Sequence, residues 1–445
     1  MIPQKLIHTL TNAAGFDEDY FVQSHNIQAP TSVRINLKKE ISDFDNQKQI
    51  GWCKHAYNLD VRPSFTYSPL FHAGCYYVQE ASSMFLHHVV KHISSIKKID
   101  TALDLCAAPG GKSTLLLDAL DDDSLLVSNE LVNSRVTVLI ENLNKWGRTN
   151  TVVTNNDAKK FASLAGMFDL IVVDAPCSGS GLFRKDKEAI KEWSLENVEM
   201  CSIRQQKILD DVMPALSNDG YLIYSTCSYS IDENETICDY LIDTFDLETV
   251  QIPIEKVWGV VESKSKQHSA FGYRFYPDKV IGEGFFIAVF KSNSNCSKKH
   301  FKKQSNYITT NTKKFEQFVD LENNKMIISR NGFNCCINKH DYDKIEQLTS
   351  QLNIKKVGVD VGEIMRDDVI PSHALALSML VKKTIHKVEL DEESAIKYLK
   401  REGILVSENK LGWALASYKG FALGWMKILQ NRINNYYPKS SRILH

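Results

Sequence analysis

The spacing of hydrophobic and polar positions becomes regular after residue 98, where short apolar runs alternate with amphipathic stretches. Apolar residues three and four apart predict helices over 134–146, 197–216 and 232–245. Several apolar runs are hydrophobic on both faces, as expected of central parallel strands. The predicted strands are 101–106, 125–130, 151–155, 169–175, 221–226 and 285–290. This alternation predicts an α/β fold built on a Rossmann-like, doubly wound sheet.

The pattern differs on either side of this unit, which we expect to occupy residues 96–291. Residues 1–95 mix short helical and strand patterns, including an alternating strand over 31–38, and predict a small α+β domain. Residues 292–314 are rich in Lys, Ser and Asn and predict a linker. Beyond it we expect a small α+β domain over 315–375 and a compact, aromatic-rich domain over 376–445.

Composition excludes several classes of protein. With 43% hydrophobic and 24% charged residues, the chain resembles an ordinary globular protein and not a disordered one. Its apolar runs are far shorter than the ~20 residues that span a bilayer, and its first residues lack the features of a secretory signal. We therefore expect a cytoplasmic protein without membrane contact, whose ten cysteines are reduced.

Basic charge is concentrated in the last third of the chain, although the formal net charge is only −1. Residues 291–314 contain seven Lys and no acid, and residues 376–445 contain twelve Lys or Arg against six acids. Such asymmetry is typical of a surface that binds a phosphate backbone. A solvated linker followed by a basic surface explains the same counts equally well.

The loop after the first predicted strand suits a ligand. Residues 104–113 read DLCAAPGGKS, and their small side chains let a ligand approach the backbone where a helix begins. A phosphate-binding P-loop is one interpretation, since GKS at 111–113 and LIVVD at 170–174 fit parts of that motif. However, Cys106 replaces its first glycine, Pro109 supplies no N–H, and the dinucleotide fingerprint GxGxxG is absent. A methyltransferase loop that holds S-adenosylmethionine is the competing interpretation.

Acids at the next two strand ends favour the methyltransferase interpretation. A carboxylate can accept both ribose hydroxyls of a nucleoside, and another acceptor can bind the adenine amino group. Glu130 and Asp157 close the second and third predicted strands. Each acid alone is better explained as a solvated loop residue or a helix cap. Together, at successive strand ends, they favour a nucleoside pocket.

Two cysteines follow adjacent strand ends, Cys177 in VDAPCSGSG (173–181) and Cys227 in YSTCSY (224–229). We expect both thiols to project toward one crevice. A thiolate that adds to C6 of cytosine makes C5 nucleophilic enough to attack a sulfonium methyl. The charge pushed into the ring must be met at N3, where a protonated Asp174 could donate a hydrogen bond. Spacing alone does not say which thiol attacks and which assists product release. Four further cysteines are expected to be small buried hydrophobes: Cys201, Cys238, Cys335 and Cys336.

Three blocks, 104–113, 174–181 and 225–228, closely resemble the signatures of the NOL1/NOP2/Sun family of RNA cytosine-C5 methyltransferases. Residues 74–80, 274–277 and 282–286 look similar to further family segments. The resemblance implies a class I S-adenosylmethionine-dependent methyltransferase in which Cys227 attacks the base and Cys177 assists release, whereas DNA cytosine methyltransferases attack with the Pro-Cys cysteine. It also implies cofactor contacts from Cys106, Ala107, Ala108, Pro109, Gly110, Gly111, Lys112, Glu130, Asp157 and Asp174.

The tail resembles that of the bacterial RsmF-like branch of this family, on shorter segments at 362–364, 371–376, 420–425 and 431–438. The branch implies 16S rRNA of the small ribosomal subunit as partner, a target near the decoding region and a PUA-like RNA-binding domain over 376–445. A tRNA or another rRNA site is the alternative substrate. Tyr436, Tyr437 and Trp425 are candidates to stack on bases. A basic surface over an aromatic core is the alternative for Trp413 and Trp425.

Two other interpretations are open. His88 and His92 lie one helical turn apart, but no acid or Cys completes a ligand set, so we expect a solvated helix face and no metal. A non-enzymatic RNA-binding or ribosome assembly factor would share the fold without the chemistry. The presence of both Cys227 and Asp174 argues against it.

Overall fold

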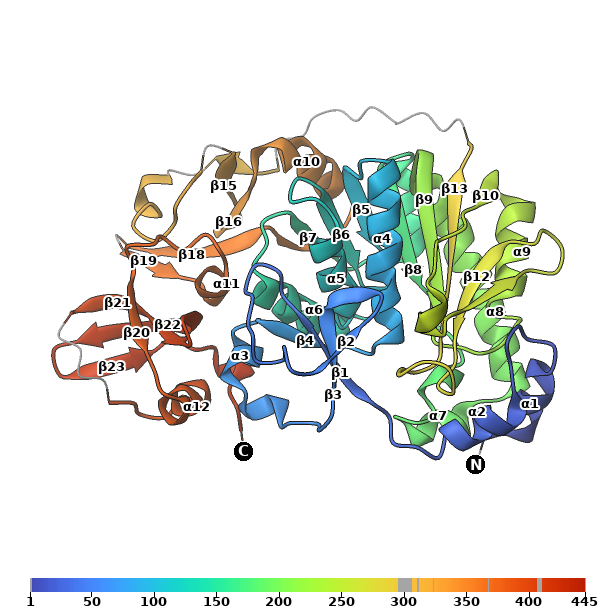
Figure 1. Cartoon of the computed structure of the whole chain (residues 1–445). Helices are drawn as coiled ribbons and strands as arrows, with labels where there is room; N and C mark the ends of the chain where they lie inside the picture. Colours follow the sequence, from blue (N-terminus) through green and yellow to red (C-terminus); the bar gives the residue numbers. More distant parts are fainter. Residues whose placement is uncertain are drawn as a thin grey trace.

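The computed structural model describes residues 2–294, 306–309, 312–322, 324–366, 368–405 and 410–444. Most of the expected basic linker, 292–314, lies outside these residues. Among the described residues the strands form four sheets, and a ten-stranded sheet occupies the centre of the molecule (Figure 1). Within the same residues, no helix has the length and apolar character needed to cross a bilayer.

The central sheet confirms the predicted doubly wound α/β fold. Its strand order is β11-β12-β13-β9-β8-β5-β6-β7-β17, with β10 paired to β13. Strands β5 to β9 run parallel to one another, while β13 and β17 are antiparallel to their neighbours β9 and β7. The strands are β5 (Thr101–Asp104), β6 (Leu125–Asn129), β7 (Thr151–Thr154), β8 (Phe168–Asp174), β9 (Leu216–Thr226), β10 (Leu247–Thr249), β11 (Val261–Lys264), β12 (Phe271–Phe275), β13 (Phe285–Ser292) and β17 (Ile354–Val357).

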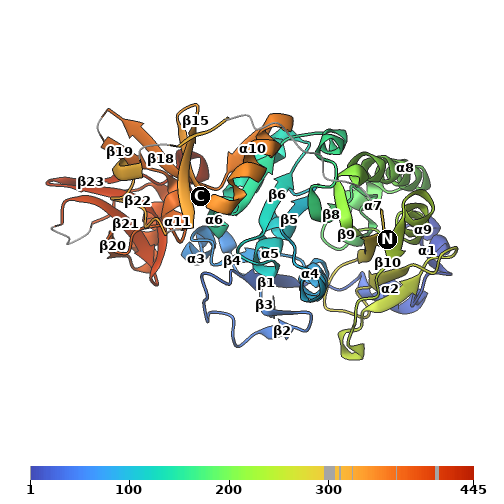
Figure 2. The ribbon, with the colours of Figure 1, turned by 90° about the horizontal axis from the view of Figure 1, so that it is seen from above.

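Helices cover both faces of this sheet, which gives three layers (Figures 1 and 2). On one face α4 (Phe85–Ile96), α5 (Gly111–Ala119) and α6 (Asn133–Trp146) contribute to one hydrophobic core. On the other face the core contains residues of α8 (Leu195–Val212), α9 (Glu235–Thr244) and α10 (Tyr342–Gln351). The three helices expected from the sequence correspond to α6, α8 and α9.

Helix α9 begins at Glu235 and not at residue 232, as the pattern had predicted. Asn234 has φ −119° and ψ −93°, outside the helical region. Its side chain accepts a hydrogen bond from Thr226 and donates one to the carbonyl of Ser228. Because Asn234 is held by the preceding loop, the helix starts only after it.

The order of the parallel strands reverses at β5, whose neighbours are β6 on one side and β8 on the other. In sheets of this kind ligands bind outside the carboxyl ends of the strands at such a reversal. Asp104 ends β5 and lies opposite Ser128 of β6 and Val172 of β8. The loops that follow β5, β6, β8 and β9 are therefore the ones to inspect.

The N-terminal part packs against the helical layer that contains α5. After α1 (Gln4–Leu10) and α2 (Glu18–Ser24) it forms a sheet of order β2-β3-β1-β4. The strand expected over 31–38 ends earlier, at Ile35. Bounds in this part are β1 (Thr31–Ile35), β2 (Lys48–Ile50), β3 (Cys53–Leu59), α3 (Pro69–His72) and β4 (Tyr76–Val78).

The C-terminal part contains two further sheets, of order β14-β15-β16-β18-β19 and β20-β21-β22-β23. Strand β17 leaves this region to pair with β7 at the edge of the central sheet. Bounds are β14 (Ile308–Thr309), β15 (Lys325–Arg330), β16 (Phe333–Asn338), β18 (Val359–Met365), β19 (Asp368–Pro371), α11 (His373–Leu377), β20 (His386–Glu389), α12 (Glu392–Lys400), β21 (Gly412–Tyr418), β22 (Phe421–Leu429) and β23 (Arg432–Asn435). The last sheet and the N-terminal sheet share one hydrophobic core.

Candidate active site

The loop between β5 and α5 is fixed by neighbouring elements. The N–H of Ala107 donates to the carbonyl of Asn129 at the end of β6, 2.8 Å away. Gly110 precedes α5 with φ +112°, and a Cβ there would lie 3.3 Å from atoms of Leu139 and Asn142 on α6. Glycine is favoured here because an L side chain would be both strained and crowded. The first N–H groups of α5, which have no partner within the helix, therefore lie next to this tightly packed loop.

Lys112 and Ser113, which the P-loop interpretation would assign to phosphate and magnesium, contact carboxylates instead. The Lys112 Nζ lies 2.8 Å from an Asp174 oxygen, and the Ser113 hydroxyl donates to Asp104 at 2.6 Å. Although burial acts against it, the carboxylate of Asp174 raises the pKa of Lys112. A loop whose cation and hydroxyl are committed to acids is a poor cradle for phosphate.

Buried acids surround this loop. Asp104 is fully buried, and one of its two oxygens has no hydrogen-bond partner among the described residues. Burial, helped by the charge of Asp174, raises the pKa of Asp104 to about 7. Burial and then the charges of Asp174, Asp104 and Glu130 raise the pKa of Cys106 far above its ordinary value. These groups therefore act on one another within a single site.

The two acids at the ends of β6 and β7 differ in their surroundings. Glu130 is 4% exposed, accepts the N–H of Val132 at 2.8 Å and lies 3.5 Å from Arg135. Asp157 is exposed and accepts the N–H of Lys159, so it caps the turn that starts at Ala158. Both the capping interpretation and a role in ligand binding are compatible with Asp157, because a carboxylate has acceptor positions to spare.

This donor set fits S-adenosylmethionine better than a nucleotide phosphate. The orphaned oxygen of Asp104 and the carboxylates of Glu130 and Asp157 can meet hydroxyl and amino hydrogens of a nucleoside. Phosphate would instead need free cations and N–H groups. The loop residues 106–112 lie between these acids and the cysteine loops.

The structure brings Cys177 and Cys227 together. They follow β8 and β9, which are adjacent and parallel, and their sulfur atoms are 3.0 Å apart. Gly181, in the turn after Cys177, donates its N–H to the carbonyl of Cys227 at 2.8 Å. The hydrogen bond with Cys227, together with burial, raises the pKa of Cys177 well above its ordinary value. The two sulfurs thus lie side by side, and the raised pKa favours the thiol form of Cys177.

Asp174 links the loop between β5 and α5 to the loops that contain Cys177 and Cys227. One oxygen accepts the hydroxyl of Ser225 at 2.8 Å, two residues before Cys227. The other oxygen lies 2.8 Å from Lys112. About a third of the Asp174 side chain is exposed, so a ligand can still reach it. Its position allows contact with the cofactor and with a base at the thiols.

Two segments of the family resemblance that lie far apart in sequence also meet. The carboxylate of Glu80 accepts the N–H of Glu283 at 2.7 Å. The carboxylate of Glu283 in turn pairs with Arg184 at 3.0 Å, in the loop that follows the Cys177 turn. The segments at 74–80 and 282–286 are therefore linked to each other and, through Arg184, to the chain that follows the Cys177 turn.

One residue of this region, Arg34, was not predicted from the sequence. Arg34 of β1 is fully buried and donates to Thr114 of α5 at 2.7 Å and to the carbonyl of Gly111 at 3.3 Å. It joins the N-terminal sheet to the cofactor loop. Its only sequence signal is a charge within an alternating strand, and this is more often a solvent-facing residue.

The aromatic residues of the tail correct one expectation. Trp425 and Tyr437 are 1% and 2% exposed, so they belong to hydrophobic cores and are not free to stack on bases. The indole N–H of Trp425 donates to the carbonyl of Ser372. Tyr436 is half-buried and packs on Trp413, with ring centroids 4.5 Å apart. The alternative of a basic surface over an aromatic core holds for Trp425.

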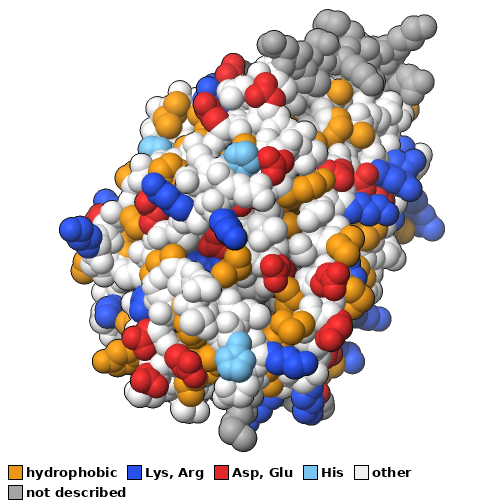
Figure 3. Space-filling model, turned by 90° about the vertical axis from the view of Figure 1, so that its right-hand side faces the viewer, with side chains coloured by type: hydrophobic (Ala, Val, Ile, Leu, Met, Phe, Trp, Pro, Cys, Tyr) orange, Lys and Arg blue, Asp and Glu red, His pale blue; other side chains and the backbone are white. Residues whose placement is uncertain are grey.

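His88 and four of the cysteines contribute to packing and hydrogen bonding within the fold. His88 of α4 bonds the carbonyl of Pro253 at 2.7 Å, and the described residues contain no group of three potential metal ligands. Cys201, Cys238, Cys335 and Cys336 are buried, as expected. On the right-hand face of the molecule acidic and basic side chains are interspersed (Figure 3). Charge therefore does not single out this face as an RNA-binding surface.

Three family models match successive parts of the chain. The model described as 16S rRNA methyltransferase RsmB/F matches residues 93–291. The N-terminal domain of 16S rRNA methyltransferase RsmF matches residues 2–81. The methyltransferase RsmF PUA domain matches residues 385–443.

Curated relatives match over nearly their whole length. "Ribosomal RNA small subunit methyltransferase F" of Shewanella piezotolerans is 30% identical, over 95% of this chain and 93% of the relative. The protein of the same name from Aeromonas salmonicida is 28% identical, over 98% and 96% of the two chains.

Solved structures match about two thirds of the chain. A methyltransferase homologue from Pyrococcus horikoshii has a TM-score of 0.52 and 25% identity, and the match covers 65% of this chain and 100% of that one. NSun6 from the same organism, solved with SFG, has a TM-score of 0.55 and 19% identity over 66% of this chain and 99% of that one. The second likeness shows the fold alone. Together with the family models and the first structure, it identifies a class I S-adenosylmethionine-dependent methyltransferase fold.

Proposed function

The chain belongs to the family of ribosomal RNA small subunit methyltransferases F, and on this premise we propose that it methylates C5 of a cytosine in 16S rRNA, near the decoding region, through a covalent bond from Cys227 to the base. It is an S-adenosylmethionine-dependent enzyme, and the cofactor, when bound, supplies the methyl group as a sulfonium. Residues 106–112, Glu130, Asp157 and Asp174 would hold it.

One observation carries the proposal: the sulfur atoms of Cys177 and Cys227 lie 3.0 Å apart beside Asp174, which itself contacts the cofactor loop. Addition of a thiolate to C6 of cytosine makes C5 nucleophilic. Cys227 is assigned this attack because its Thr-Cys-Ser context resembles that of the attacking cysteine of the NOL1/NOP2/Sun family. Two thiols at one point match a reaction that needs both attack and release.

Cys177 is assigned to release. After methyl transfer the C5 proton must leave, the C5–C6 double bond must re-form and the Cys227 sulfur must depart with its electron pair. A second sulfur 3.0 Å away can exchange a proton with either group. Cys177 starts as a thiol and can pass its proton to the departing Cys227 sulfur. The Cys177 thiolate that results then accepts the C5 proton, which restores the thiol.

Asp174 is assigned to the charge that develops on the ring. While Cys227 is bonded to C6, negative charge accumulates toward N3, where Asp174, by sharing a proton with the base, stabilises it through a hydrogen bond. The ammonium of Lys112, 2.8 Å from Asp174, supplies positive charge at this point.

The other regions are assigned to RNA binding. We propose that residues 1–95 position the RNA, 96–291 catalyse, 292–314 link, 315–375 form a small α+β domain, and the PUA-like region 376–445 binds rRNA within the small subunit, in the cytoplasm. A paired cytosine must leave its helix to reach Cys227, and these contacts offset that cost.

Bisulfite sequencing of 16S rRNA from cells with and without this gene tests the proposal. We expect one cytosine to lose its protection from conversion when the gene is deleted, and the intact gene to restore it. A gene encoding Cys227→Ala should not restore it. Unchanged protection after deletion would contradict the proposal, and equal ribosome maturation with the variant gene would favour an assembly factor.

A further inference from the structure

Glu233 is a fully buried carboxylate in the turn between β9 and α9. One oxygen accepts the N–H of Ser178 at 2.8 Å and the side-chain amide of Gln205 at 3.2 Å. The other accepts the hydroxyls of Ser178 and Ser228, each at 2.5 Å. All four donors are neutral, so hydrogen bonds alone offset the cost of burying this group.

The two serines are the residues that directly follow the two cysteines. Ser178 follows Cys177 in the loop after β8, and Ser228 follows Cys227 in the loop after β9. A single carboxylate therefore accepts hydrogen bonds from both loops and connects them. The sulfur atoms that precede these serines lie 3.0 Å apart. A shift of either loop would have to break at least one short hydrogen bond to Glu233.

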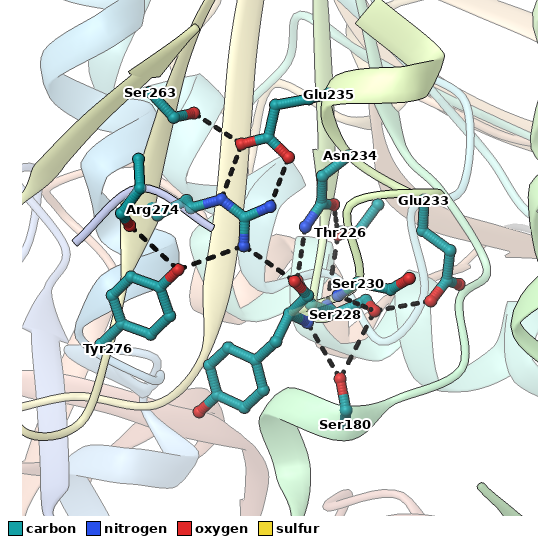
Figure 4. A network of polar contacts seen from close by, with 12 residues as sticks. Ser180, Thr226, Ser228, Ser230, Glu233, Asn234, Glu235, Ser263, Arg274 and Tyr276 are labelled. Carbon is teal, nitrogen blue, oxygen red and sulfur yellow. Dashed lines mark hydrogen bonds and ion pairs between the residues drawn. The ribbon is translucent and has the colours of Figure 1, made fainter. Parts of the chain in front are cut away.

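The neighbouring polar residues belong to the same network but include a second buried carboxylate, Glu235, which does not bond either serine (Figure 4). Arg274 forms a buried ion pair with Glu235 and donates to the carbonyl of Tyr229 at 2.8 Å. Glu235 also accepts the hydroxyl of Ser263 at 2.6 Å. Figure 4 shows Glu233 on the opposite side of Ser228 from this ion pair. Glu235 thus offers a matched buried carboxylate that contacts neither cysteine loop at its serine.

The chemistry of the acceptor matters as well as its place. A carboxylate only accepts hydrogen bonds, so it can satisfy four donors at once. The amide of Gln would present one acceptor and one donor, and would oppose donors on one side. Burial raises the pKa of Glu233, while its bonds to Ser178 and Ser228 lower it. The charge of Glu233 also contributes to the raised pKa of Cys177.

We propose that Glu233 is a positioning residue that sets the distance between the Cys177 and Cys227 sulfur atoms by bridging Ser178 and Ser228. This inference rests on the proposed function for its catalytic consequence, but the geometry can be tested without RNA. The oxidant diamide accepts the two thiol hydrogens and two electrons and leaves a disulfide, and the rate of this step depends on how closely the two sulfurs are held.

The experiment treats the full chain with diamide and follows the disulfide between residues 177 and 227 by peptide mass spectrometry. We expect rapid cross-linking in the unchanged protein. In Glu233→Gln the rate should fall by a factor of about 10 or more, because two thiols that are no longer oriented lose effective concentration. Ser228→Ala, which removes one of the bridging hydroxyls, should give an intermediate rate. Glu235→Gln should lower thermal stability yet cross-link at a rate close to that of the unchanged protein.

Methyl transfer is then measured on the same proteins. Misplacement of reacting groups can cost about 100-fold in rate, so we expect kcat of Glu233→Gln to fall toward that level while KM for RNA and for S-adenosylmethionine changes little. Equal cross-linking by Glu233→Gln and the unchanged protein would overturn the positioning role, as would failure of the unchanged protein to cross-link. Slower cross-linking in a protein that never methylates RNA would instead leave the role standing and contradict the proposed function.

Discussion

Arg34 on β1 and Asp118 on α5 form an ion pair in which neither side chain is exposed to solvent. The pair fastens the N-terminal sheet to the helix that follows the β5–α5 loop. Asp118 also accepts the indole N–H of Trp146 at 3.1 Å, and Arg148 lies 3.9 Å away. Burial raises the pKa of Asp118 to about 6 although both arginines oppose this.

Arg34→Met should destabilise the protein strongly, because it leaves the buried Asp118 with weaker compensation. Removing one partner of a buried pair typically costs about 3–5 kcal/mol. The double variant Arg34→Met/Asp118→Leu should regain much of the loss, since neither charge is then buried. Urea unfolding of the three proteins measures the free energies. A single variant as stable as the unchanged protein would show that the pair contributes nothing.

Stability should depend on the protonation of Asp104. Its folded-state pKa is raised to about 7 from an ordinary 3.8. The folded state therefore binds more protons than the unfolded state between these values, and the free energy of unfolding falls as pH rises from about 4 to 7. Asp104→Asn should remove this contribution, up to about 1.4 kcal/mol per pH unit.

The difference in unfolding free energy between the unchanged protein and Asp104→Asn, measured in urea from pH 4 to pH 8, isolates this residue. Asp118 titrates in an overlapping range, but it is present in both proteins and its contribution cancels. A difference that does not vary with pH would show that Asp104 keeps an ordinary pKa in the folded protein.

Gly110→Ala should weaken binding of S-adenosylmethionine. A residue at φ +112° with a Cβ 3.3 Å from α6 forces the loop to shift. Left-handed backbone of this kind costs about 1–3 kcal/mol in a non-glycine residue. Isothermal titration should show Kd rising by a corresponding factor of about 5 to 150.

Gly403→Ala is the control for this substitution. Gly403 has no atom within 4 Å of its would-be Cβ and no positive φ. Its variant should bind S-adenosylmethionine as the unchanged protein does. Equal affinity of the Gly110 variant would place the cofactor away from this loop.

Substitution of the two thiols should separate attack from release. Cys227→Ala should abolish methyl transfer, because no sulfur remains to add to C6. Cys177→Ala should still form the covalent bond but release product slowly, so that a protein–RNA adduct accumulates and resists denaturing electrophoresis. Adduct in the Cys227 variant, or rapid turnover by the Cys177 variant, would reverse or remove these roles.

Local pattern was sufficient for the central fold and for the loops that carry the chemistry. Apolar runs such as 221–226 suit buried strands in the middle of a sheet. A short loop such as 174–181 must lie where its strand ends, so the position of the strand also predicts the position of the loop. The meeting of Cys177 with Cys227 follows from parallel strands ending at one edge, which the alternation of strands and helices already implies.

Contacts between distant parts of the chain had no such local signal. Arg34 lies 84 positions from Asp118, and within its strand it resembles a solvent-facing residue. Glu233 lies within the predicted helix 232–245, whereas in the structure it precedes the helix and its carboxylate bonds Ser178 of another loop. Trp425 is buried because Ser372 and neighbouring core residues surround it. In sequence, an aromatic residue of a basic tail has the same pattern whether it lies in the core or stacks on a base.

Tyr437 should stabilise the N-terminal sheet as well as the C-terminal one. It is 2% exposed, lies in the core shared by β1 residues such as Val33 and β22 residues such as Met426, and its hydroxyl contacts His72 Nδ1 at 3.2 Å. Tyr437→Ala should cost about 3–5 kcal/mol, as removal of large buried rings does, and should accelerate hydrogen exchange in β1 and β4. The adjacent Tyr436 packs on Trp413 within the C-terminal part, so Tyr436→Ala should accelerate exchange only there. Because a core shared by two sheets opens on both sides when it loses a ring, acceleration confined to the C-terminal strands in both variants would show that the PUA-like region is an independent module.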